Sequence, residues 1–363
     1  MSNLLYFFAG LAALGVGAEL LVRGASRLSL SFGISPLVVG LTVVAFGTSA
    51  PEMAVSVGAA LSGKVDVAVG NVVGSNIFNV LFILGASALI VPLAVHAQVV
   101  RQEVPIMIGA SLLFAALAFD GRIGFPEAAL LFAALVAYTA FLVVQSRRES
   151  RATADEFAGE MPPPAAWDAH WGVQLLLVLG GLALLVVGAG WLVDAAVAFA
   201  RAFGVSDLVI GLTIVAAGTS LPEVAASLTA ALRGERDIAV GNVVGSNVFN
   251  VLGCLGLAGM AAPGGLVVAP ELLRVDLWVL LATMLACLPV FAYRHEIRRW
   301  QGGLFLLAYV AYTTYLVLHA QRHPLLPGFV DAVLFGLLPA CALLLFLMWL
   351  KRRPGHRPDC GNT

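Results

Sequence analysis

Long apolar segments separated by short polar ones divide this chain from end to end. Each is about 20 residues or longer, the length at which a helix crosses the hydrocarbon core of a bilayer. They fall into two groups of five and one final segment. The first group is 4–28, 36–61, 66–92, 99–119 and 124–145; the second is 172–202, 207–232, 238–262, 271–293 and 298–319; the last is 329–350. The pattern predicts an all-α integral membrane protein with eleven transmembrane helices.

The composition supports this prediction and excludes several functions. Hydrophobic residues make up 60% of the chain and charged residues 11%, with a mean hydropathy of +0.97, whereas a soluble domain carries about 25% charged residues. A net charge of −1 argues against nucleic-acid binding. The four cysteines are scattered and have no metal-binding spacing. We therefore expect a lipid bilayer around the protein, no nucleic-acid partner and no cofactor.

Two stretches of the sequence occur twice, at a constant offset of 171 residues. GLTVVAFGTSAPE at Gly40–Glu52 returns as GLTIVAAGTSLPE at Gly211–Glu223, and DVAVGNVVGSNIFNVL at Asp66–Leu81 returns as DIAVGNVVGSNVFNVL at Asp237–Leu252. Equivalent helices are five crossings apart. Because five is odd, the two copies must enter the membrane from opposite sides. The sequence therefore predicts inverted repeats of five transmembrane helices, plus an additional C-terminal transmembrane helix.

The repeats and one polar segment give a domain organisation. Residues 1–145 are the first five-span repeat and 171–320 the second, inverted one. Residues 146–170, which include Pro162–Pro164, form a polar cytoplasmic linker between them. Residues 321–363 add the eleventh helix and a basic tail.

The basic residues predict the orientation of the chain. With the N-terminus outside, 15 of the 20 Lys and Arg residues fall at cytoplasmic ends and loops, and the exceptions are Lys64, Arg122, Arg201, Arg274 and Arg322. Loops rich in Lys and Arg stay in the cytoplasm. We expect a multi-pass protein of the cell inner or plasma membrane, with its N-terminus outside and its C-terminus in the cytoplasm.

Each repeat places one carboxylate within an apolar span, directly after a proline. Pro51 has no N–H to donate to the carbonyl of Gly47, and its ring crowds that carbonyl. The helix should break before Glu52 and free backbone carbonyls, which are tolerated at membrane depth only where they line protein or a polar cavity. Pro222 and Glu223 repeat the arrangement. The two acids should face each other near the midplane.

Oxygen-bearing side chains share a helix face with each carboxylate. Thr48 and Ser49 lie one turn before Glu52, and Ser75 and Asn79 are one turn apart on the next span. Hydroxyl, carbonyl and carboxylate oxygens are ligands that Ca²⁺ and Na⁺ prefer. The duplication supplies the same set from the second repeat: Thr219, Ser220, Glu223, Ser246 and Asn250.

Two facing carboxylates limit the cargo. They repel each other in a low dielectric, and at least one takes up a proton unless cations are present. One Ca²⁺, two Na⁺ or two protons neutralise the pair, and competing occupants of one site are what an exchanger needs. A buried acid can instead pair with a base or reach the interface. Recurrence of Pro, Thr, Ser and Asn in register, with no Lys or Arg nearby in sequence, favours function.

The remaining intramembrane charges have structural interpretations. Glu19 and Arg23, one turn apart on the first span, suggest an ion pair within the helix or between helices. Two acid–base couples recur near the starts of the fourth and ninth spans, and we expect them to be interface anchors: Arg101 with Glu103, and Arg274 with Asp276.

The duplicated motifs GTSAPE with GNVVGSNIFN, and GTSLPE with GNVVGSNVFN, resemble the two α-repeats of the cation/calcium exchanger superfamily. The similarity is greatest to the prokaryotic sodium/calcium exchangers, and it covers the first ten spans. It implies ten packed helices in inverted repeats, with ions held by the second, third, seventh and eighth. The first and sixth helices would form a long tilted pair that slides across this core.

The resemblance also implies individual roles. Glu52 and Glu223 would chelate Ca²⁺ together with oxygens of Thr48 and Thr219. Flanking Na⁺ sites would be formed by Ser49, Ser75, Ser220 and Ser246 and by the carbonyls of Ala45 and Ala216. Asn79 matches the family pattern, whereas Asn250 stands where Asp is common. The eleventh span also departs from the ten-helix pattern.

These observations predict a secondary active antiporter that exchanges Ca²⁺ for Na⁺. The main alternative is a Ca²⁺/H⁺ exchanger that uses the same carboxylates as proton acceptors. A passive channel is less favoured, because inverted repeats that meet at one site suit alternating access. An enzyme is not expected, since the sequence has no nucleotide-binding loop, metal–histidine motif or nucleophile–base pair.

Overall fold

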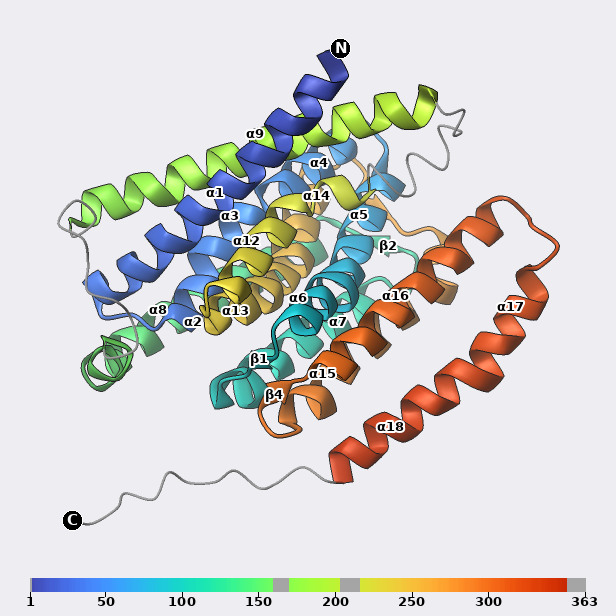
Figure 1. The fold of residues 1–363 in the computed structure, drawn as a ribbon. Helices are drawn as coiled ribbons and strands as arrows, with labels where there is room; N and C mark the ends of the chain where they lie inside the picture. Colours follow the sequence, from blue (N-terminus) through green and yellow to red (C-terminus); the bar gives the residue numbers. More distant parts are fainter. Residues whose placement is uncertain (1, 159–169, 203–215, 351–363) are drawn as a thin grey trace.

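The computed structural model describes residues 2–158, 170–202 and 216–350 (Figure 1). Within these ranges, nine helices are long and apolar enough to cross a membrane, and a further span is a pair of helices bent by 44°. The predicted span at 207–232 is described only from Ala216 onward. The fold is an all-α membrane bundle, as the hydropathy pattern predicts.

The first repeat contains five spans, two of them assembled from short helices. Its elements are α1 (Ser2–Phe32); α2 (Pro36–Val39), η1 (Gly40–Val44), α3 (Ala45–Thr48) and α4 (Ala50–Leu61); α5 (Val65–Phe78), η2 (Asn79–Leu84) and α6 (Gly85–Ile90); η3 (Val99–Glu103) and α7 (Val104–Leu117); and α8 (Phe125–Ala158). Here η denotes a π-helical turn. Helix α8 outlasts the predicted fifth span, so the segment predicted as a linker from residue 146 is helical up to Ala158.

The second repeat follows the same plan. Its described elements are α9 (Trp171–Ala202); α11 (Ala216–Gly218) and α12 (Leu221–Leu232); α13 (Arg236–Val248), η5 (Phe249–Cys254) and α14 (Leu255–Ala261); η6 (Leu272–Asp276) and α15 (Leu277–Ala292); and α16 (Arg299–Ala320). The eleventh span consists of α17 (Leu326–Ala332), η7 (Val333–Leu337) and α18 (Leu338–Leu350). It lies on the outside of the bundle (Figure 1), where α17 contacts α16 and α18 contacts α15.

Two short antiparallel strand pairs reveal how the repeats are oriented. Strand β1 (Leu93–Ala94), between the third and fourth spans, pairs with β4 (Glu296–Ile297), between the ninth and tenth. Strand β2 (Arg122–Ile123) pairs with β3 (Leu266–Val267). In the duplication, β3 is equivalent to β1 and β4 to β2. The strand after the third span of one repeat therefore pairs with the strand after the fourth span of the other repeat. These two connections lie on the same side of the membrane only if the repeats are inverted.

Helices α1 and α9 lie side by side across one face of the bundle (Figure 1). Their contact depends on glycine. A Cβ at Gly17 would lie 2.9 Å from the carbonyl oxygen of Gly181, and a Cβ at Gly181 would lie 2.6 Å from the backbone nitrogen of Leu21. Small residues allow membrane helices to approach this closely. The predicted pairing of the first and sixth helices is confirmed.

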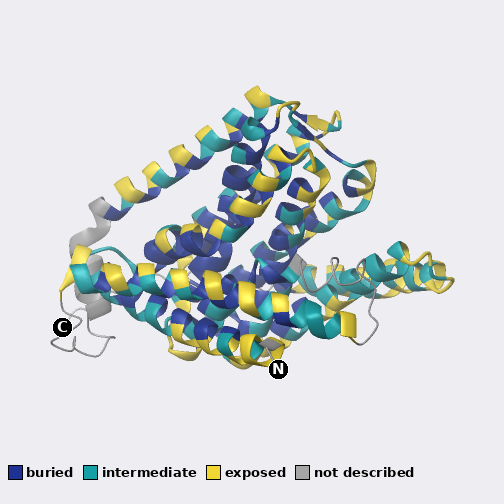
Figure 2. Cartoon of the chain, turned by 90° about the horizontal axis from the view of Figure 1, so that it is seen from above, coloured by how far each residue is buried: buried dark blue, intermediate teal, exposed yellow. Residues whose placement is uncertain are grey.

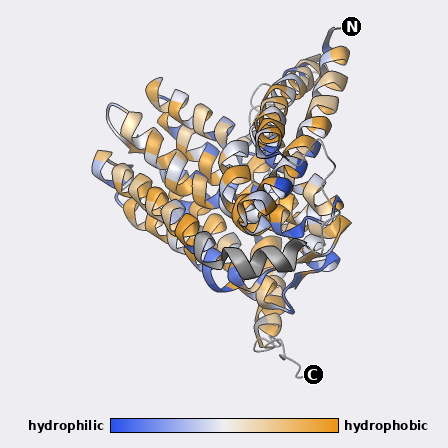
Figure 3. Cartoon of the chain, turned by 90° about the vertical axis from the view of Figure 1, so that its left-hand side faces the viewer, coloured by the Kyte–Doolittle hydropathy of each residue, from blue (hydrophilic) through white to orange (hydrophobic). Residues whose placement is uncertain are grey.

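Burial identifies the third and eighth spans as the centre of the molecule. In their most apolar windows, 72% of the third span and 89% of the eighth are buried, against 6% of α16. Buried residues gather in the middle of the bundle (Figure 2), and hydrophobic residues dominate along the lengths of the helices (Figure 3). Apolar side chains that face outward are suited to lipid. The central position belongs to the helices that carry the GNVVGSN motifs.

Candidate functional site

Both predicted helix breaks are present, and each lies immediately before its carboxylate. Ser49 leaves helical geometry between α3 and α4 (φ −80°, ψ 4°), and Ser220 does so before α12 (φ −88°, ψ 7°). The following proline occupies the first turn of the new helix, where no backbone donor is needed. Glu52 and Glu223 thus lie in the first turns of α4 and α12, where the helix dipole favours negative charge.

Each carboxylate is held by a serine of the opposite repeat. The hydroxyl of Ser49 donates to Oε1 of Glu223 at 3.0 Å, and the hydroxyl of Ser220 lies 2.8 Å from Oε1 of Glu52. Ser220 Oγ is also 3.3 Å from Ser75 Oγ. All five side chains are buried, and both glutamates have no exposed surface. The two repeats therefore build one site together.

Asn242, on α13, joins the two repeats a second time. Its Nδ2 donates to Oγ of Ser227 at 2.8 Å and lies 3.5 Å from the backbone carbonyl of Glu223. Its Oδ1 accepts the hydroxyl of Thr48 at 3.0 Å. The amide therefore fixes the helix turn that carries Glu223 and positions a threonine of the other repeat.

Asn71, on α5, makes the equivalent contacts in the first repeat. Its Nδ2 lies 3.1 Å from Oγ of Ser56 and 3.4 Å from the carbonyl of Glu52, and its Oδ1 lies 3.5 Å from the hydroxyl of Thr219. Asn71 and Asn242 were missed by the sequence reasoning. The available signal was their identity in register, because each follows the glycine that opens GNVVGSN.

Several buried polar atoms of the site have no hydrogen-bond partner in the described part of the chain. The second oxygen, Oε2, of both Glu52 and Glu223 is among them. The others on candidate ligands are Ser246 Oγ, both amide atoms of Asn79, and Nδ2 of Asn250. Burying a polar atom without a partner is costly. The oxygens among these atoms are the groups that a dehydrated cation can satisfy.

The ligand set is built from oxygen. In the described residues, no group of three or more His, Cys, Asp or Glu side chains comes close enough to hold a metal ion. The carboxylates instead lie among hydroxyls and amides from both repeats. Hydroxyl, amide and carboxylate oxygens suit hard cations.

The backbone carbonyl of Ala45, which the resemblance implies as a Na⁺ ligand, already accepts hydrogen bonds in this structure. It accepts the N–H of Ser49 at 3.0 Å and lies 3.4 Å from the hydroxyl of Thr48. The first of these is the ordinary backbone bond of an α-helix, so regular helical bonding still reaches Ala45 before the break at Ser49. Ala216, its counterpart, is the first described residue of its span.

Asn79 and Asn250 occupy equivalent π-helical turns. Asn79 begins η2, and Asn250 is the second residue of η5. Such turns are often found at functional sites. One contact distinguishes the copies: the thiol of Cys254 lies 3.5 Å from Oδ1 of Asn250, whereas the position equivalent to Cys254 in the first repeat is Ile83.

Two of the other acidic residues considered from the sequence, Glu19 and Glu103, have structural partners. Glu19, on α1, forms an ion pair with Arg233, just after α12, so the predicted pairing is between elements. The interpretation of Glu103 as an interface anchor is wrong, because this side chain is fully buried. It accepts hydrogen bonds from Gln102 at 2.7 Å, Tyr138 at 2.8 Å and Gln98 at 3.1 Å, and these donors replace water.

Comparison with known proteins gives a consistent result over most of the chain. The family model described as "Sodium/calcium exchanger protein" matches residues 2–144 and 173–318. The putative antiporter CaxA of Alkalimonas amylolytica is 40% identical over 313 residues, covering 85% of this chain and 96% of its own. The sodium/calcium exchanger MaX1 of Methanosarcina acetivorans is 32% identical over 345 residues, covering 86% and 98%.

The fold is also similar to a solved exchanger. A structure of the sodium-calcium exchanger NCX_Mj, soaked with zero Na⁺ and Ca²⁺, superposes with a TM-score of 0.74 at 31% identity and covers 87% of this chain and 99% of its own. The eleventh span lies beyond the residues that the family model matches.

Proposed function

This chain belongs to the sodium/calcium exchanger family, and we propose that it is a secondary antiporter that moves Ca²⁺ against Na⁺ by alternating access. The observation that carries the proposal is the reciprocal hydrogen bonding of two fully buried carboxylates. Ser49 holds Glu223 and Ser220 holds Glu52, and each glutamate keeps one oxygen without a hydrogen-bond partner among the described residues.

Ca²⁺ as substrate binds between Glu52 and Glu223 and accepts the free Oε2 atoms as ligands. One divalent ion neutralises both carboxylates, which removes the repulsion that a low dielectric strengthens. In the structure the hydroxyls of Thr48 and Thr219 contact Asn242 and Asn71. Because each threonine lies one helical turn before its glutamate, its hydroxyl can rotate toward an ion bound there.

Two Na⁺ ions compensate the same charge when Ca²⁺ leaves. The neutral oxygens that flank the carboxylates suit a monovalent ion, which needs fewer charged ligands than Ca²⁺. These flanking groups are Ser49, Ser75, Ser220, Ser246, Asn79, Asn250 and the carbonyls of Ala45 and Ala216. A protein named as a sodium/calcium exchanger, MaX1, is 32% identical to this chain, which supports Na⁺ as the driving ion.

Alternating access follows from the inverted repeats. The breaks at Ser49 and Ser220 give each carboxylate-bearing span two segments that meet at the site. In our proposal the α1–α9 pair slides over the glycine contacts at Gly17 and Gly181 and exposes the site to one side at a time. The distribution of basic residues supports an orientation with the N-terminus outside and the C-terminus in the cytoplasm, in the inner or plasma membrane.

The test is ⁴⁵Ca²⁺ uptake into proteoliposomes that contain the purified full chain. We expect uptake under an outward Na⁺ gradient and little uptake under a pH gradient alone, with protein-free liposomes as the blank. Uptake that responds only to the pH gradient would support the Ca²⁺/H⁺ alternative and overturn the sodium assignment. Uptake that needs no counter-ion gradient would indicate a passive channel.

A further inference from the structure

The eleventh span and the body of the protein line a large apolar cavity that is partly open to the outside. The cavity has a volume of about 660 Å³ and lies between α15, α16 and the α17–η7–α18 span, with Leu81 of η2 also in its lining. This volume is within the range of ligand pockets, roughly 300–1,000 Å³. None of the candidate ion ligands lines it, so it is separate from the site between the two carboxylates.

The eleventh span faces this cavity with a stripe of apolar side chains. Leu326, Val330, Leu337, Cys341 and Met348 line the cavity and recur at helical spacing. Met348 alone is buried among the described side chains of the span, and the others in the stripe are half-buried. The inner face of the span is therefore turned toward the body and packs against it at the C-terminal end, around Leu345 and Met348, while the rest of the stripe stays half-buried.

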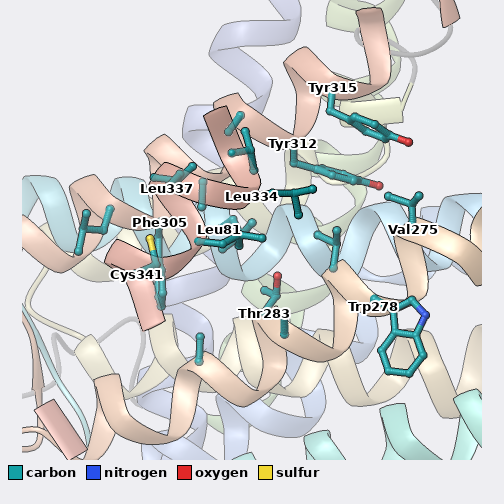
Figure 4. A pocket seen from close by; sticks show the side chains of 18 of the residues that line it. Leu81, Val275, Trp278, Thr283, Phe305, Tyr312, Tyr315, Leu334, Leu337 and Cys341 are labelled. Atoms are coloured by element: carbon teal, nitrogen blue, oxygen red, sulfur yellow. The ribbon is translucent and has the colours of Figure 1, made fainter. Parts of the chain in front are cut away.

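One end of the cavity has the residues that proteins place at lipid headgroups. Trp278, Tyr312 and Tyr315 gather on the same side, away from Phe305 and Cys341 (Figure 4). Such aromatic side chains are enriched at the membrane–water interface. The opposite end, near Met348, is held by a contact of 3.1 Å between the side-chain amide of Gln301 and the sulfur of Met348.

Arg274 and His319 add basic groups to the aromatic end, and both line the cavity. Arg274 has no acidic partner among the described residues. The nearby carboxylate of Asp276 accepts the hydroxyl of Tyr312 at 2.8 Å and does not itself line the cavity. The guanidinium of Arg274 is thus available to an anion at the mouth of an apolar cavity.

We propose that this cavity is a binding site for one membrane phospholipid, with an acyl chain along the apolar stripe and the phosphodiester at Arg274. An empty space of this size would deprive its lining side chains of dispersion contacts, and water is not stable against an apolar lining. Acyl chains are the apolar molecules that surround a spanning helix. A guanidinium binds phosphate oxygens with paired, charge-assisted hydrogen bonds.

The bound lipid joins the eleventh span to the exchanger core. It fills the gap that direct packing leaves open, and it contacts Leu81, two residues after Asn79. The site includes the eleventh span, which the family model does not match, and it does not depend on which ions are exchanged.

Native mass spectrometry of the detergent-purified full chain tests the site. The chain is titrated with dioleoyl phosphatidylglycerol or with dioleoylglycerol, which has the same acyl chains and no phosphate. We expect one retained phosphatidylglycerol per chain, preferred over dioleoylglycerol by about fivefold, the effect of one basic residue at a membrane surface. Arg274→Gln should remove the preference, whereas Arg101→Gln, at the equivalent position in the first repeat, should keep it.

A second pair of variants tests the cavity itself. Ala308→Trp fills it from α16 and should abolish retention of both lipids, whereas Leu307→Trp, on the neighbouring lipid-facing position, should not. Size-exclusion chromatography of the same samples checks that the variants fold. Equal retention in the two tryptophan variants would overturn the proposal. So would a preference for phosphatidylglycerol that survives Arg274→Gln, or a dimer that buries this face in place of lipid.

Discussion

The two repeats hold their carboxylates in the same way and differ in the neutral groups around them. The 3.0 Å contact from Ser49 to Glu223 is mirrored by the 2.8 Å contact from Ser220 to Glu52. Ser220 also lies 3.3 Å from Ser75, whereas Ser246, the duplicate of Ser75, has no partner among the described residues. The charged part of the site is thus symmetric and its neutral part is not.

This difference indicates that the carboxylates and the neutral oxygens have separate roles, which the duplication alone does not distinguish. Because each glutamate depends on the opposite repeat, neither copy forms a site by itself. The surroundings of the neutral oxygens can differ between the repeats. For example, Cys254 contacts Asn250 in the second repeat, whereas the equivalent position in the first repeat is Ile83. Substitutions in the symmetric part should therefore cost the same in either copy, and substitutions in the asymmetric part should not.

The largest expected effect comes from neutralising either glutamate. Glu52→Gln and Glu223→Gln should each lower Na⁺-driven Ca²⁺ uptake by roughly 100-fold or more, since removing one member of a buried charged set costs about 3 kcal/mol or more. The double variant should be little worse than either single one, because the two acids act as a unit.

Proteoliposome uptake at equal protein incorporation measures this effect. Glu271→Gln, an exposed acid at the start of the ninth span, is the matched control and should transport normally. Near-normal transport by one of the two glutamate variants would contradict the equal roles of Glu52 and Glu223.

Asn71 and Asn242 should have the next largest effect. Asn71→Ala and Asn242→Ala release a threonine and a helix turn that carries a glutamate, and we expect about 10- to 100-fold weaker Ca²⁺ affinity in each, as for residues that orient metal ligands. The apparent KM for Ca²⁺ should rise more than the maximal rate falls. Ser87→Ala, a buried serine on α6 away from the contacts described, serves as control. A defect in only one asparagine variant would count against equivalent roles.

Cys254 should have a smaller, one-sided effect. Cys254→Ala removes the donor to Asn250 and should raise the KM for Ca²⁺ by about fivefold, the value of one neutral hydrogen bond. Cys254→Ser keeps a donor and should restore most of the affinity. Ile83→Ala, the equivalent truncation, removes no hydrogen bond and should not shift KM in the same way. A serine variant as weak as the alanine variant would argue that only packing matters.

The ion pair between Glu19 and Arg233 should contribute least. Both side chains are well exposed, at 42% and 38%, and such pairs contribute about 1 kcal/mol or less. Glu19→Gln should lower the melting temperature slightly in low salt and not in high salt, as differential scanning fluorimetry can measure. At the equivalent positions stand Gly190, in the second repeat, and Ser62, in the first, so no counterpart of this ion pair is expected.

Glu235 lies in the same loop as Arg233, between α12 and α13, and should make the stability of the second repeat depend on pH. Burial raises the pKa of Glu235, and Ser26 and Arg233 offset part of that rise. The folded state therefore holds this proton more tightly than the unfolded state, and stability present below the ordinary pKa is lost as pH rises through the folded pKa. Glu235→Gln should raise the melting temperature at about pH 8 and not at about pH 4. A larger gain in acid would contradict this sign.

Much of this architecture could be predicted because the bilayer imposes simple rules on sequence. Span lengths followed from apolar runs, and inversion followed from the odd number of crossings and is confirmed by the β1–β4 and β2–β3 pairs. The helix breaks followed from the missing donors of Pro51 and Pro222. These features depend on local sequence or on counting.

Other features depend on contacts between distant segments, which local patterns do not encode. Asn71 and Asn242 lie in glycine-containing segments whose pattern predicts close helix packing. Their roles become visible only from the contacts that α5 and α13 make with the opposite repeat. Glu103 has the pattern of an interface residue until Tyr138, on the next span, covers it. Hydropathy located the eleventh span and could not indicate that a cavity separates it from α15 and α16.

The central claim is that one cation lies between the two repeats. Anomalous diffraction from crystals of the full chain soaked with Sr²⁺, a hard divalent ion that takes the same oxygen ligands as Ca²⁺, tests it most directly. We expect a single strong peak between the carboxylates of Glu52 and Glu223, which disappears in Glu52→Gln crystals soaked in the same way. Two separate peaks, each beside one glutamate, or a peak elsewhere in the bundle, would contradict it.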